Sequence, residues 1–447
     1  MCADEDVQCK FIIPPSVSKC NNNTDRGKRL LKKTIVRVII RKNGFSGDFM
    51  DKVRVALVGI SGYGRLYLDR LLDKADSRIE IVGFVEPYPE SCLRLAEIKE
   101  RGIPVFSSCE EMYSFVGVDL TVIVSPIAYH TKQIITALEN GSNVLCEKPL
   151  CAEESDIELI ARAQSTSGKF VYVGYQWSYS DAINRLKKDI ISGKYGKCIS
   201  CKSLVLWPRD IKYFTRSCGW AGKIRLDNGY AVYDSVLNNA TAHYLHNLLF
   251  LLGEESSSLV PSTVDCTLLR ANDIENFDTA KLDMAFESGT KATVLASHAI
   301  NRSFEPSFMM HFEKGDVYYS ARKDECSLSV MPGFYTEYGK ICGYSSDGEK
   351  TLYGDPFADG FKKLYSAVEA ALNGYTGEGV CGIKASSAHT RVINRIQSSF
   401  PIYSIEPSLI RTENMLVYAD GLFEKMIGIF KNGEGTLEQF KEKKDER

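Results

Sequence analysis

The stretch Val53-Arg54-Val55-Ala56-Leu57-Val58-Gly59-Ile60-Ser61-Gly62-Tyr63-Gly64 decides the fold, and about twenty residues later it is followed by Ile81-Val82-Gly83-Phe84-Val85-Glu86. The β-branched run before Gly59 predicts a strand that is buried on both faces. Residues 65–72 then place leucines at helical spacing, and the second apolar run predicts another strand, which ends at Glu86. Strand, glycine turn, helix, strand and acid, in this order, predict a doubly wound parallel α/β sheet with a dinucleotide site.

Each part of this predicted site has a chemical task. Glycines lack a Cβ, so the turn can approach a pyrophosphate closely, and the helix after it offers free N–H groups to the phosphates. Ser61 stands at the usual middle glycine position, so the phosphate turn is expected to differ slightly. Glu86 would accept hydrogen bonds from the adenosine ribose and repel a 2′-phosphate, which favours NAD over NADP. The expected cofactor contacts here are Gly59, Ser61, Gly62, Tyr63, Gly64 and Glu86.

Composition and length limit the class of protein. The chain has 447 residues, 44% of them apolar, and a formal net charge of -2, as expected for a soluble globular protein of about two domains. It contains no apolar run of roughly eighteen residues, so no membrane span is predicted. The near-balanced charge does not indicate the excess of basic residues that is typical of nucleic-acid-binding proteins. Fourteen scattered cysteines predict a reducing compartment and a cytoplasmic location.

The cysteines Cys198 and Cys201 form a CxxC pair within an alternating stretch. Residues three apart on a regular strand point to opposite faces of the sheet, and no second cysteine pair follows. We therefore expect neither zinc binding nor redox chemistry from this pair, and no metal site elsewhere.

The chain divides into three regions. Residues 1–49 are basic and show little periodicity, so they are interpreted as a disordered or non-native leader before Met50, with a basic targeting arm as the alternative. Residues 50–170 are predicted to form the Rossmann domain. Residues 171–447 contain alternating runs that predict a second, α+β domain with a mostly antiparallel sheet.

Further strands and helices alternate within the first domain. Strands are expected over 103–106, 119–124 and 143–147, with a helix over 131–139. In such sheets the ligand crevice lies at the carboxyl ends of the strands. The loops at that edge are the Gly59 turn, residues 125–130 and residues 147–149.

The third of these loops, Glu147-Lys148-Pro149, carries a resemblance to a known family. At matching spacing it is preceded by Pro126, His130 and Ala137-Leu138-Glu139-Asn140-Gly141, and it is followed by Ala152-Glu153-Glu154. From about Met50 to residue 415 the chain resembles the Gfo/Idh/MocA oxidoreductases, named in part for glucose-fructose oxidoreductase and inositol dehydrogenase. The resemblance implies that Lys148 lies beside the nicotinamide and the reacting oxygen and that Pro149 is often cis. It adds Ser125, Pro126, His130 and Glu147 to the expected cofactor contacts.

Lys148 has a chemical rationale that does not depend on the resemblance. A partly desolvated ammonium has a lowered pKa, so it can polarise a carbonyl or share a proton. Hydride transfer leaves charge on the substrate oxygen, and a cation stabilises that charge. The alternative is a surface lysine after a strand.

A second group of candidates lies in residues 238–253, which predict a helix ending at Gly253. Asn239, His243 and His246 are spaced to share one face of such a helix. The resemblance places His243 on the family's catalytic histidine and Asn239 on its aspartate. Asn cannot take a proton, so proton transfer would fall to His243 or Lys148. Asp234 is a possible source of the missing carboxylate.

The alternative reading of these histidines is helix packing, which we favour for His246. His298, His311 and His389 have no comparable context.

A polar aromatic segment supplies the substrate candidates Tyr175, Trp177, Arg209, Tyr213 and Arg216. Aromatic faces with guanidinium donors suit a polyhydroxylated or anionic substrate, although aromatic residues are as often core. The family usually has an Arg where Trp177-Ser178 stands, which puts a standard sugar pocket in doubt.

These observations predict hydride transfer between NAD(P) and a carbohydrate-like or cyclitol alcohol or ketone. The resemblance further implies a homodimer or homotetramer. Two alternatives remain: transient use of NAD for glycoside cleavage, and a catalytically silent dinucleotide-binding sensor.

Overall fold

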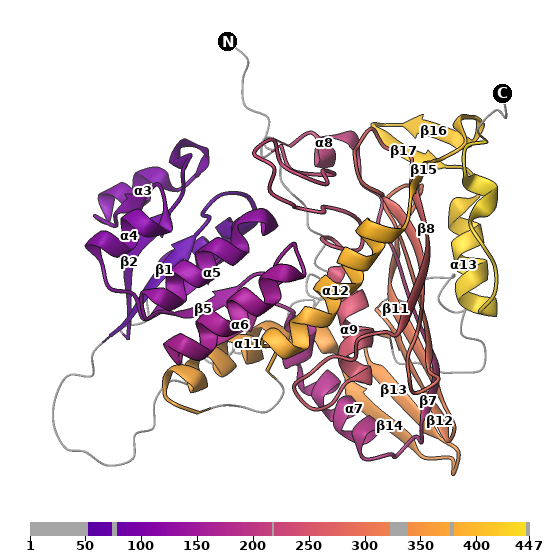
Figure 1. Cartoon of the computed structure of the whole chain (residues 1–447). Coiled ribbons are helices and arrows are strands. Elements are labelled where there is room, and N and C mark those ends of the chain that lie inside the picture. Colours follow the sequence, from indigo (N-terminus) through magenta and orange to yellow (C-terminus); the bar gives the residue numbers. More distant parts are fainter. Residues whose placement is uncertain (1–51, 74–77, 217–218, 322–337, 376–379, 444–447) are drawn as a thin grey trace, which may run out of the picture. The chain divides into compact units, whose positions relative to one another are not determined.

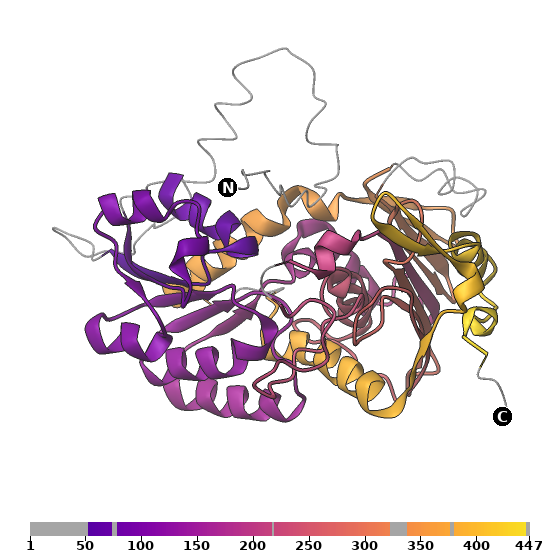
Figure 2. The same cartoon turned by 90° about the horizontal axis from the view of Figure 1, so that it is seen from above.

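A computed structural model of the chain describes residues 52–73, 78–216, 219–321, 338–375 and 380–443 (Figures 1 and 2). The leader predicted over residues 1–49 lies outside the described residues. Two large sheets organise the rest, one fully parallel and one mostly antiparallel, which confirms the predicted fold class.

The first sheet has six parallel strands in the order β3-β2-β1-β4-β5-β6, the order of doubly wound dinucleotide folds. Its strands are β1 (Val53–Val58), β2 (Ile79–Val85), β3 (Val105–Phe106), β4 (Leu120–Ile123), β5 (Asn143–Cys146) and β6 (Val171–Val173). Ala56 and Leu57 in the central strand are fully buried, as the continuous apolar run predicts.

Helices connect these strands. They are α2 (Arg65–Asp73), α3 (Leu95–Glu100), α4 (Cys109–Phe115), α5 (His130–Glu139) and α6 (Ser155–Ser167), with the short 3-10 helices η2 (Gly62–Gly64), η3 (Pro89–Ser91) and η4 (Ile127–Tyr129). Figures 1 and 2 show α5 and α6 side by side on one face of the sheet. On the other face, α11 (Pro356–Leu372) packs against α2, where the Arg70 guanidinium donates to the Tyr365 hydroxyl at 2.6 Å.

The second sheet has nine strands in the order β14-β13-β12-β11-β7-β10-β9-β8-β15, of which only the pairs β7–β10 and β8–β15 are parallel. The strands are β7 (Cys198–Leu206), β8 (Thr263–Arg270), β9 (Thr279–Ala285), β10 (Lys291–Ser297), β11 (Phe304–Phe312), β12 (Gly315–Ser320), β13 (Ile341–Ser345), β14 (Lys350–Gly354) and β15 (Ile402–Ser404). A separate hairpin pairs β16 (Ile410–Glu413) with β17 (Leu416–Ala419).

Helices cover both faces of this sheet. Figure 1 shows α9 and α12 on one side and α13 on the other. Alternate residues of β7 follow this division, because Val205 belongs to the core that contains α9 whereas Leu204 and Leu206 pack with α13. The remaining helices are α7 (Asp181–Ile191), α8 (Ile211–Phe214), α9 (Ala242–Leu252), α12 (Ile383–Ser399), α13 (Leu422–Asn432), η5 (Gln176–Tyr179), η6 (Pro407–Leu409) and η7 (Glu438–Phe440).

The predicted orientation of the CxxC cysteines is wrong. The pairing of β7 with β11 is irregular between His311 and Phe312, opposite Ser200 and Cys198. Because of this bulge, Cys198 and Cys201 both pack against the same core. Contact with Cys198 and burial raise the pKa of the Cys201 thiol.

Candidate active site

The glycine turn follows β1 at the carboxyl edge of the parallel sheet. Gly59 has a φ of +85°, a left-handed conformation that favours glycine. A Cβ on Gly64 would lie 2.1 Å from the Gly59 carbonyl oxygen, so only glycine allows η2 and α2 to begin this close to the strand. A Cβ on Gly62 would meet nothing within 4 Å, so its surroundings are open. Among the described residues, the amides of Ser61 and Gly62 have no hydrogen-bond acceptor.

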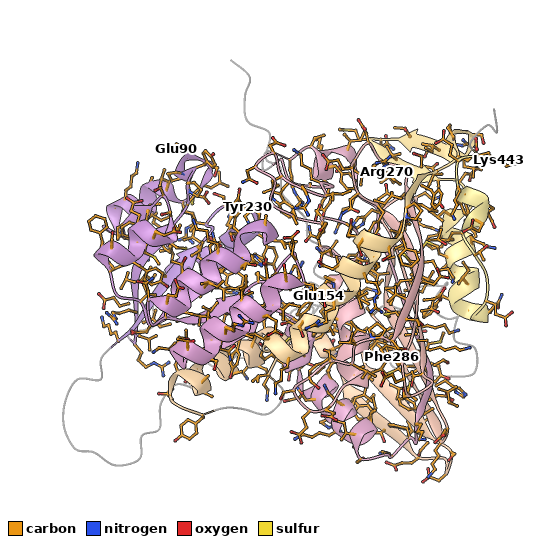
Figure 3. All side chains as sticks on the ribbon, in the orientation of Figure 1. Glu90, Glu154, Tyr230, Arg270, Phe286 and Lys443 are labelled. Carbon is orange, nitrogen blue, oxygen red and sulfur yellow. The ribbon has the colours of Figure 1, made fainter. Side chains whose placement is uncertain are left out.

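Glu86 lies beside this turn at the end of β2. Its carboxylate accepts the N–H groups of Ile60 and Tyr88, each at 3.3 Å. The Ser61 hydroxyl meets the Ser91 hydroxyl at 2.8 Å, which ties the turn to η3, where Glu90 is labelled in Figure 3. Turn and acid therefore lie together at the sheet edge, as the spacing predicts for a ribose and pyrophosphate site. Tyr63 is partly buried and its ring lies 6.4 Å from that of Tyr67.

His130 links the loops after β4 and β5. Its Nε2 lies 2.9 Å from the Ser125 carbonyl oxygen and its Nδ1 lies 2.8 Å from that of Pro149. Burial lowers the pKa of His130, so a neutral ring donates to one of these carbonyls at a time. Pro126 precedes η4 in the same loop, and the Lys148–Pro149 peptide bond is cis.

Glu147 lies behind the sheet edge and is 5% exposed. It accepts the Tyr67 hydroxyl at 2.5 Å and the Lys148 amide at 3.0 Å, and burial raises its pKa. A Cβ on Gly174 would come within 3.2 Å of its carboxylate. Glu147 therefore holds the backbone that presents Lys148.

Lys148 reaches a segment far away in the sequence. Its Nζ donates to the Asn239 carbonyl oxygen at 2.7 Å and to Asn239 Oδ1 at 3.2 Å. The Asn239 amide then donates to Asp234 at 2.8 Å, and Asp234 also accepts the Gly222 N–H at 2.6 Å. Burial lowers the pKa of Lys148 and raises that of Asp234. The carboxylate that the sequence left unplaced therefore lies next to Asn239 and is joined through it to Lys148.

The predicted helix begins later than its sequence suggests. α9 starts at Ala242, so Asn239 lies in the turn before it and does not share a helix face with the histidines. Asn238 donates from its side chain to the Tyr233 carbonyl at 3.1 Å, one of the local side-chain bonds that compete with helix formation. Asn239 still meets Lys148, but from this turn.

The two histidines of α9 have different surroundings. The His243 ring is partly exposed, its centroid is 5.7 Å from that of Tyr175, and its Nδ1 has no partner among the described residues. Burial, with a smaller effect of the Lys148 charge, holds the pKa of His243 well below its usual range. His246 is 1% exposed, stacks on Tyr175 at 3.8 Å and lies 2.9 Å from the Ser178 hydroxyl. The packing interpretation favoured for His246 matches this position.

Three of the substrate candidates, Arg209, Tyr213 and Arg216, lie together. The guanidinium carbons of Arg209 and Arg216 lie 5.0 Å and 4.2 Å from the centre of the Tyr213 ring. The Tyr213 hydroxyl lies 3.4 Å from the Asn239 amide nitrogen, so this cluster adjoins Lys148. His298, for which the sequence offered no context, has its ring 5.8 Å from Tyr213 and its Nδ1 2.7 Å from the Trp207 carbonyl oxygen. No spacing signal connects His298 to the other residues.

Trp177 and Tyr175 differ from the expectation that they line a substrate pocket. Trp177 is 4% exposed and packs edge to face against Tyr244 and Tyr319, with centroids at 5.1 and 5.2 Å. Tyr175 is fully buried behind the two histidines of α9. Both are core residues, because large rings gain most from full burial.

Residues between α8 and α9 also reach the loops of the first sheet. Tyr230, labelled in Figure 3, has its ring 6.0 Å from Tyr129. Arg225 donates to Glu153 at 2.9 Å, just after the Lys148 loop. The segment that carries Asp234 is thereby anchored to both of these loops.

Two features, a membrane-spanning helix and a metal-binding cluster, were sought among the residues that the structure describes. None of their helices is long and apolar enough to cross a membrane. They also contain no group of three or more His, Cys, Asp or Glu side chains placed to hold a metal ion.

Comparisons with known proteins give the site a family context. The model of an oxidoreductase family with an NAD-binding Rossmann fold, GFO_IDH_MocA, matches residues 53–175. An inositol 2-dehydrogenase from Corynebacterium glutamicum (strain R) is 28% identical over 166 residues, 37% of this chain. The chain thus spans about half of that relative, 49% of its length.

Two other proteins match over more of their length. An inositol 2-dehydrogenase from Rhizobium meliloti (strain 1021) is 20% identical over 352 residues, 76% of this chain and 97% of the relative. The crystal structure of the WlbA dehydrogenase from Bordetella pertussis, in complex with NADH and UDP-GlcNAcA, matches with a TM-score of 0.60 at 21% identity. This match covers 78% of this chain and 96% of that one, and it shows a shared fold. Residues 53–175 of this chain therefore match the NAD-binding Rossmann domain of the Gfo/Idh/MocA oxidoreductase family.

Proposed function

We propose that this protein is an NAD-dependent oxidoreductase that transfers a hydride between nicotinamide and a carbohydrate-like or cyclitol alcohol or ketone. The placement of Lys148 carries the proposal: its ammonium extends from the edge of the dinucleotide-type sheet and is held by Asn239. A cation there can stabilise charge on a substrate oxygen. The similar inositol 2-dehydrogenases, and the neighbour crystallised with NADH, support this choice.

The glycine turn and Glu86 fit the cofactor. The open surroundings of Gly62 and the amides of Ser61 and Gly62 suit a pyrophosphate, and the Glu86 carboxylate suits a ribose with a free 2′-hydroxyl. NAD supplies the hydride acceptor or donor when bound. These residues favour NAD over NADP, because the Glu86 carboxylate would repel a 2′-phosphate.

We assign proton transfer to Lys148. Two of its three N–H donors go to Asn239, so among the described residues one remains for the substrate oxygen. Because burial lowers its pKa, the neutral amine is accessible and can take the proton of an alcohol. His243 has a pKa well below its usual range, so it is a weak base and acts as a neutral hydrogen-bonding group. Asn239 orients Lys148 and exchanges no proton.

The direction of the pH dependence follows from this assignment. Alcohol oxidation requires neutral Lys148, so its rate rises as the pH increases through the lowered pKa of Lys148. Ketone reduction requires the protonated form, so its rate falls over the same range.

One observation favours a second candidate function, a silent NAD sensor: Asn239 stands where the family has an aspartate. Asp234, 2.8 Å from the Asn239 amide nitrogen, restores a carboxylate to the cluster, which is why we rank the enzyme first. Transient use of NAD for glycoside cleavage would need the same residues and would differ in leaving no free NADH.

We also propose a Rossmann domain over residues 50–170 and a substrate domain over residues 171–447. A cytoplasmic location is supported by the described cysteines, which are all free thiols. A homodimer or homotetramer remains our proposal for the assembly, and its mass in solution would test it.

The proposed function is tested with the full chain. NADH and NADPH are titrated by fluorescence, and then sugars, cyclitols and sugar acids are added to the NAD⁺ complex. We expect tighter binding of NADH and formation of NADH with at least one compound. Failure to bind either dinucleotide would overturn the proposal, and binding without turnover on the whole panel would favour the sensor. Release of a cleaved glycoside without free NADH would favour transient use of the cofactor.

A further inference from the structure

The substrate side of the candidate site has more positive than negative charge. Arg209, Arg216 and Lys148 all adjoin the pair formed by Tyr213 and Asn239. The carboxylate in this cluster is Asp234, and both of its oxygens already accept protein donors, the Gly222 N–H and the Asn239 amide. Asp234 thus holds the loop and Asn239, and its charge also interacts with Arg216 and Lys148.

Arg209 is the cation of this cluster whose charge is not paired with a carboxylate among the described residues. It lies just after β7, where its backbone N–H donates to the His298 carbonyl at 3.3 Å. Its guanidinium lies over the rings of Tyr213 and Trp207, with the carbon 5.0 Å and 5.9 Å from their centroids. Among the described residues it forms no ion pair, and its Nε is buried with no acceptor.

A partly buried guanidinium without an anion carries an energetic cost, because Arg cannot lose its proton. Neither of the two titratable rings next to Arg209 supplies a negative charge. Burial, followed by the effect of Arg209, lowers the pKa of His298 to about 3, so its ring is neutral. Burial raises the pKa of Tyr213, so its hydroxyl also stays neutral. An anionic ligand would remove the cost.

We propose that the substrate carries an anionic oxygen group, a carboxylate or a phosphate ester, which binds to Arg209. This inference rests on the proposed function, and it narrows the substrate class to acidic sugars or polyols. Guanidinium groups bind carboxylates and phosphates through two parallel N–H donors, and stacking on aromatic rings holds them in orientation. Arg216, on the same Tyr213 ring, lies where it can contact the same group.

The experiment compares matched compounds on the full chain with NADH present. Thermal stability is measured with D-glucose, D-glucuronate and D-glucose 6-phosphate, and with D-galactose and D-galacturonate, because a ligand that binds the native state raises its Tm. We expect an acid in at least one set to raise the Tm clearly more than its neutral partner. The shift should shrink with added salt. The uronate and phosphate arms identify which anionic group is bound.

Two variants sharpen the test. Arg209→Gln should reduce the apparent affinity for the acid at least tenfold, and the preference over the neutral partner should fall with it. Arg302→Gln is the matched control, because Arg302 also lies over an aromatic ring, 4.2 Å from the centre of Phe423, but it pairs with Glu424. It should leave the preference unchanged.

The proposal is overturned if the acids raise the Tm no more than their neutral partners, or if Arg209→Gln keeps the preference of the wild type. Oxidation of neutral sugars at rates equal to those of the acids would overturn it while leaving the proposed function intact. Failure of the wild type to bind NADH would be a separate result, and it would contradict the proposed function itself.

Discussion

The cofactor side and the substrate side of the candidate site are built differently. The cofactor side, made of the Gly59 turn, Glu86 and the loops after β4 and β5, comes from one continuous stretch and uses much backbone. The substrate side joins a loop of the parallel sheet to a segment outside it, because the Lys148 Nζ donates to Asn239 in the turn before α9. Backbone geometry therefore governs the first side, and side-chain packing governs the second.

Among variants that change one side of the site and leave the other intact, Lys148→Ala should have the largest effect. It removes the cation from the substrate side, so kcat should fall about 10²–10³-fold, the range for losing one charge-stabilising donor. NADH affinity should change less than about threefold, a free-energy change below about 0.7 kcal/mol. Steady-state kinetics and fluorescence titration measure both. Lys132→Ala, which changes an exposed lysine of α5, is the control. An active Lys148→Ala variant would refute the assigned role.

Gly64→Ala tests the cofactor side. The new Cβ would lie 2.1 Å from the Gly59 carbonyl oxygen, so the turn must shift. We expect a loss of about 1–3 kcal/mol in the free energy of unfolding and weaker NADH binding. Denaturant unfolding and titration measure these changes.

Gly428→Ala is the matched control for this variant, since a Cβ there meets nothing within 4 Å. It should leave NADH binding near the wild type and raise the free energy of unfolding by about 0.5–1 kcal/mol, because alanine is the better residue inside α13. Equal behaviour of the two variants would show that the close approach at Gly64 is unimportant.

Glu86→Gln should change cofactor preference while leaving the substrate side intact. Removing one carboxylate charge relieves repulsion of a 2′-phosphate worth about 1 kcal/mol, so the preference for NADH over NADPH should fall about fivefold. Parallel titrations of the two cofactors measure the ratio. Glu90→Gln, an exposed acid on the neighbouring η3, should leave it unchanged. An unaltered ratio in Glu86→Gln would place the ribose elsewhere.

The smallest expected effect is a shift in pH profile from Asn239→Asp. Asp234 disfavours ionisation of the new carboxyl group, but once ionised that group favours the charged form of Lys148, so the midpoint of alcohol oxidation should move to higher pH by about one unit. The profile of kcat against pH measures this shift. Asn228→Asp, exposed and away from Lys148, should leave the midpoint in place. A shift to lower pH would contradict proton transfer by Lys148.

Sequence patterns predicted most elements well. The strands expected over 119–124 and 143–147 appear as Leu120–Ile123 and Asn143–Cys146, with ends trimmed where pairing stops. The strand expected over 103–106 is confined to Val105–Phe106. The helix expected over 131–139 includes His130.

The misplaced features share a cause. The late start of α9 reflects local side-chain bonds of Asn238, and the shared face of Cys198 and Cys201 reflects a bulge opposite β11. Trp177 was assigned to a pocket but is core. None of these outcomes follows from periodicity, because each depends on a side-chain bond, a strand register or a packing contact that residue spacing does not encode.

By itself, the sequence determined the parallel sheet, the glycine turn and the acid at the end of β2, because these depend on short-range backbone conformation and local burial. Only the tertiary structure decided that Asn239 joins Lys148 to Asp234, that His246 faces the core, and that Arg209 lies over Tyr213 without a partner carboxylate among the described residues. Those relations depend on distant segments meeting in space. Their hydrogen bonds and charge balance exist only once both sheets and the helices between them have packed.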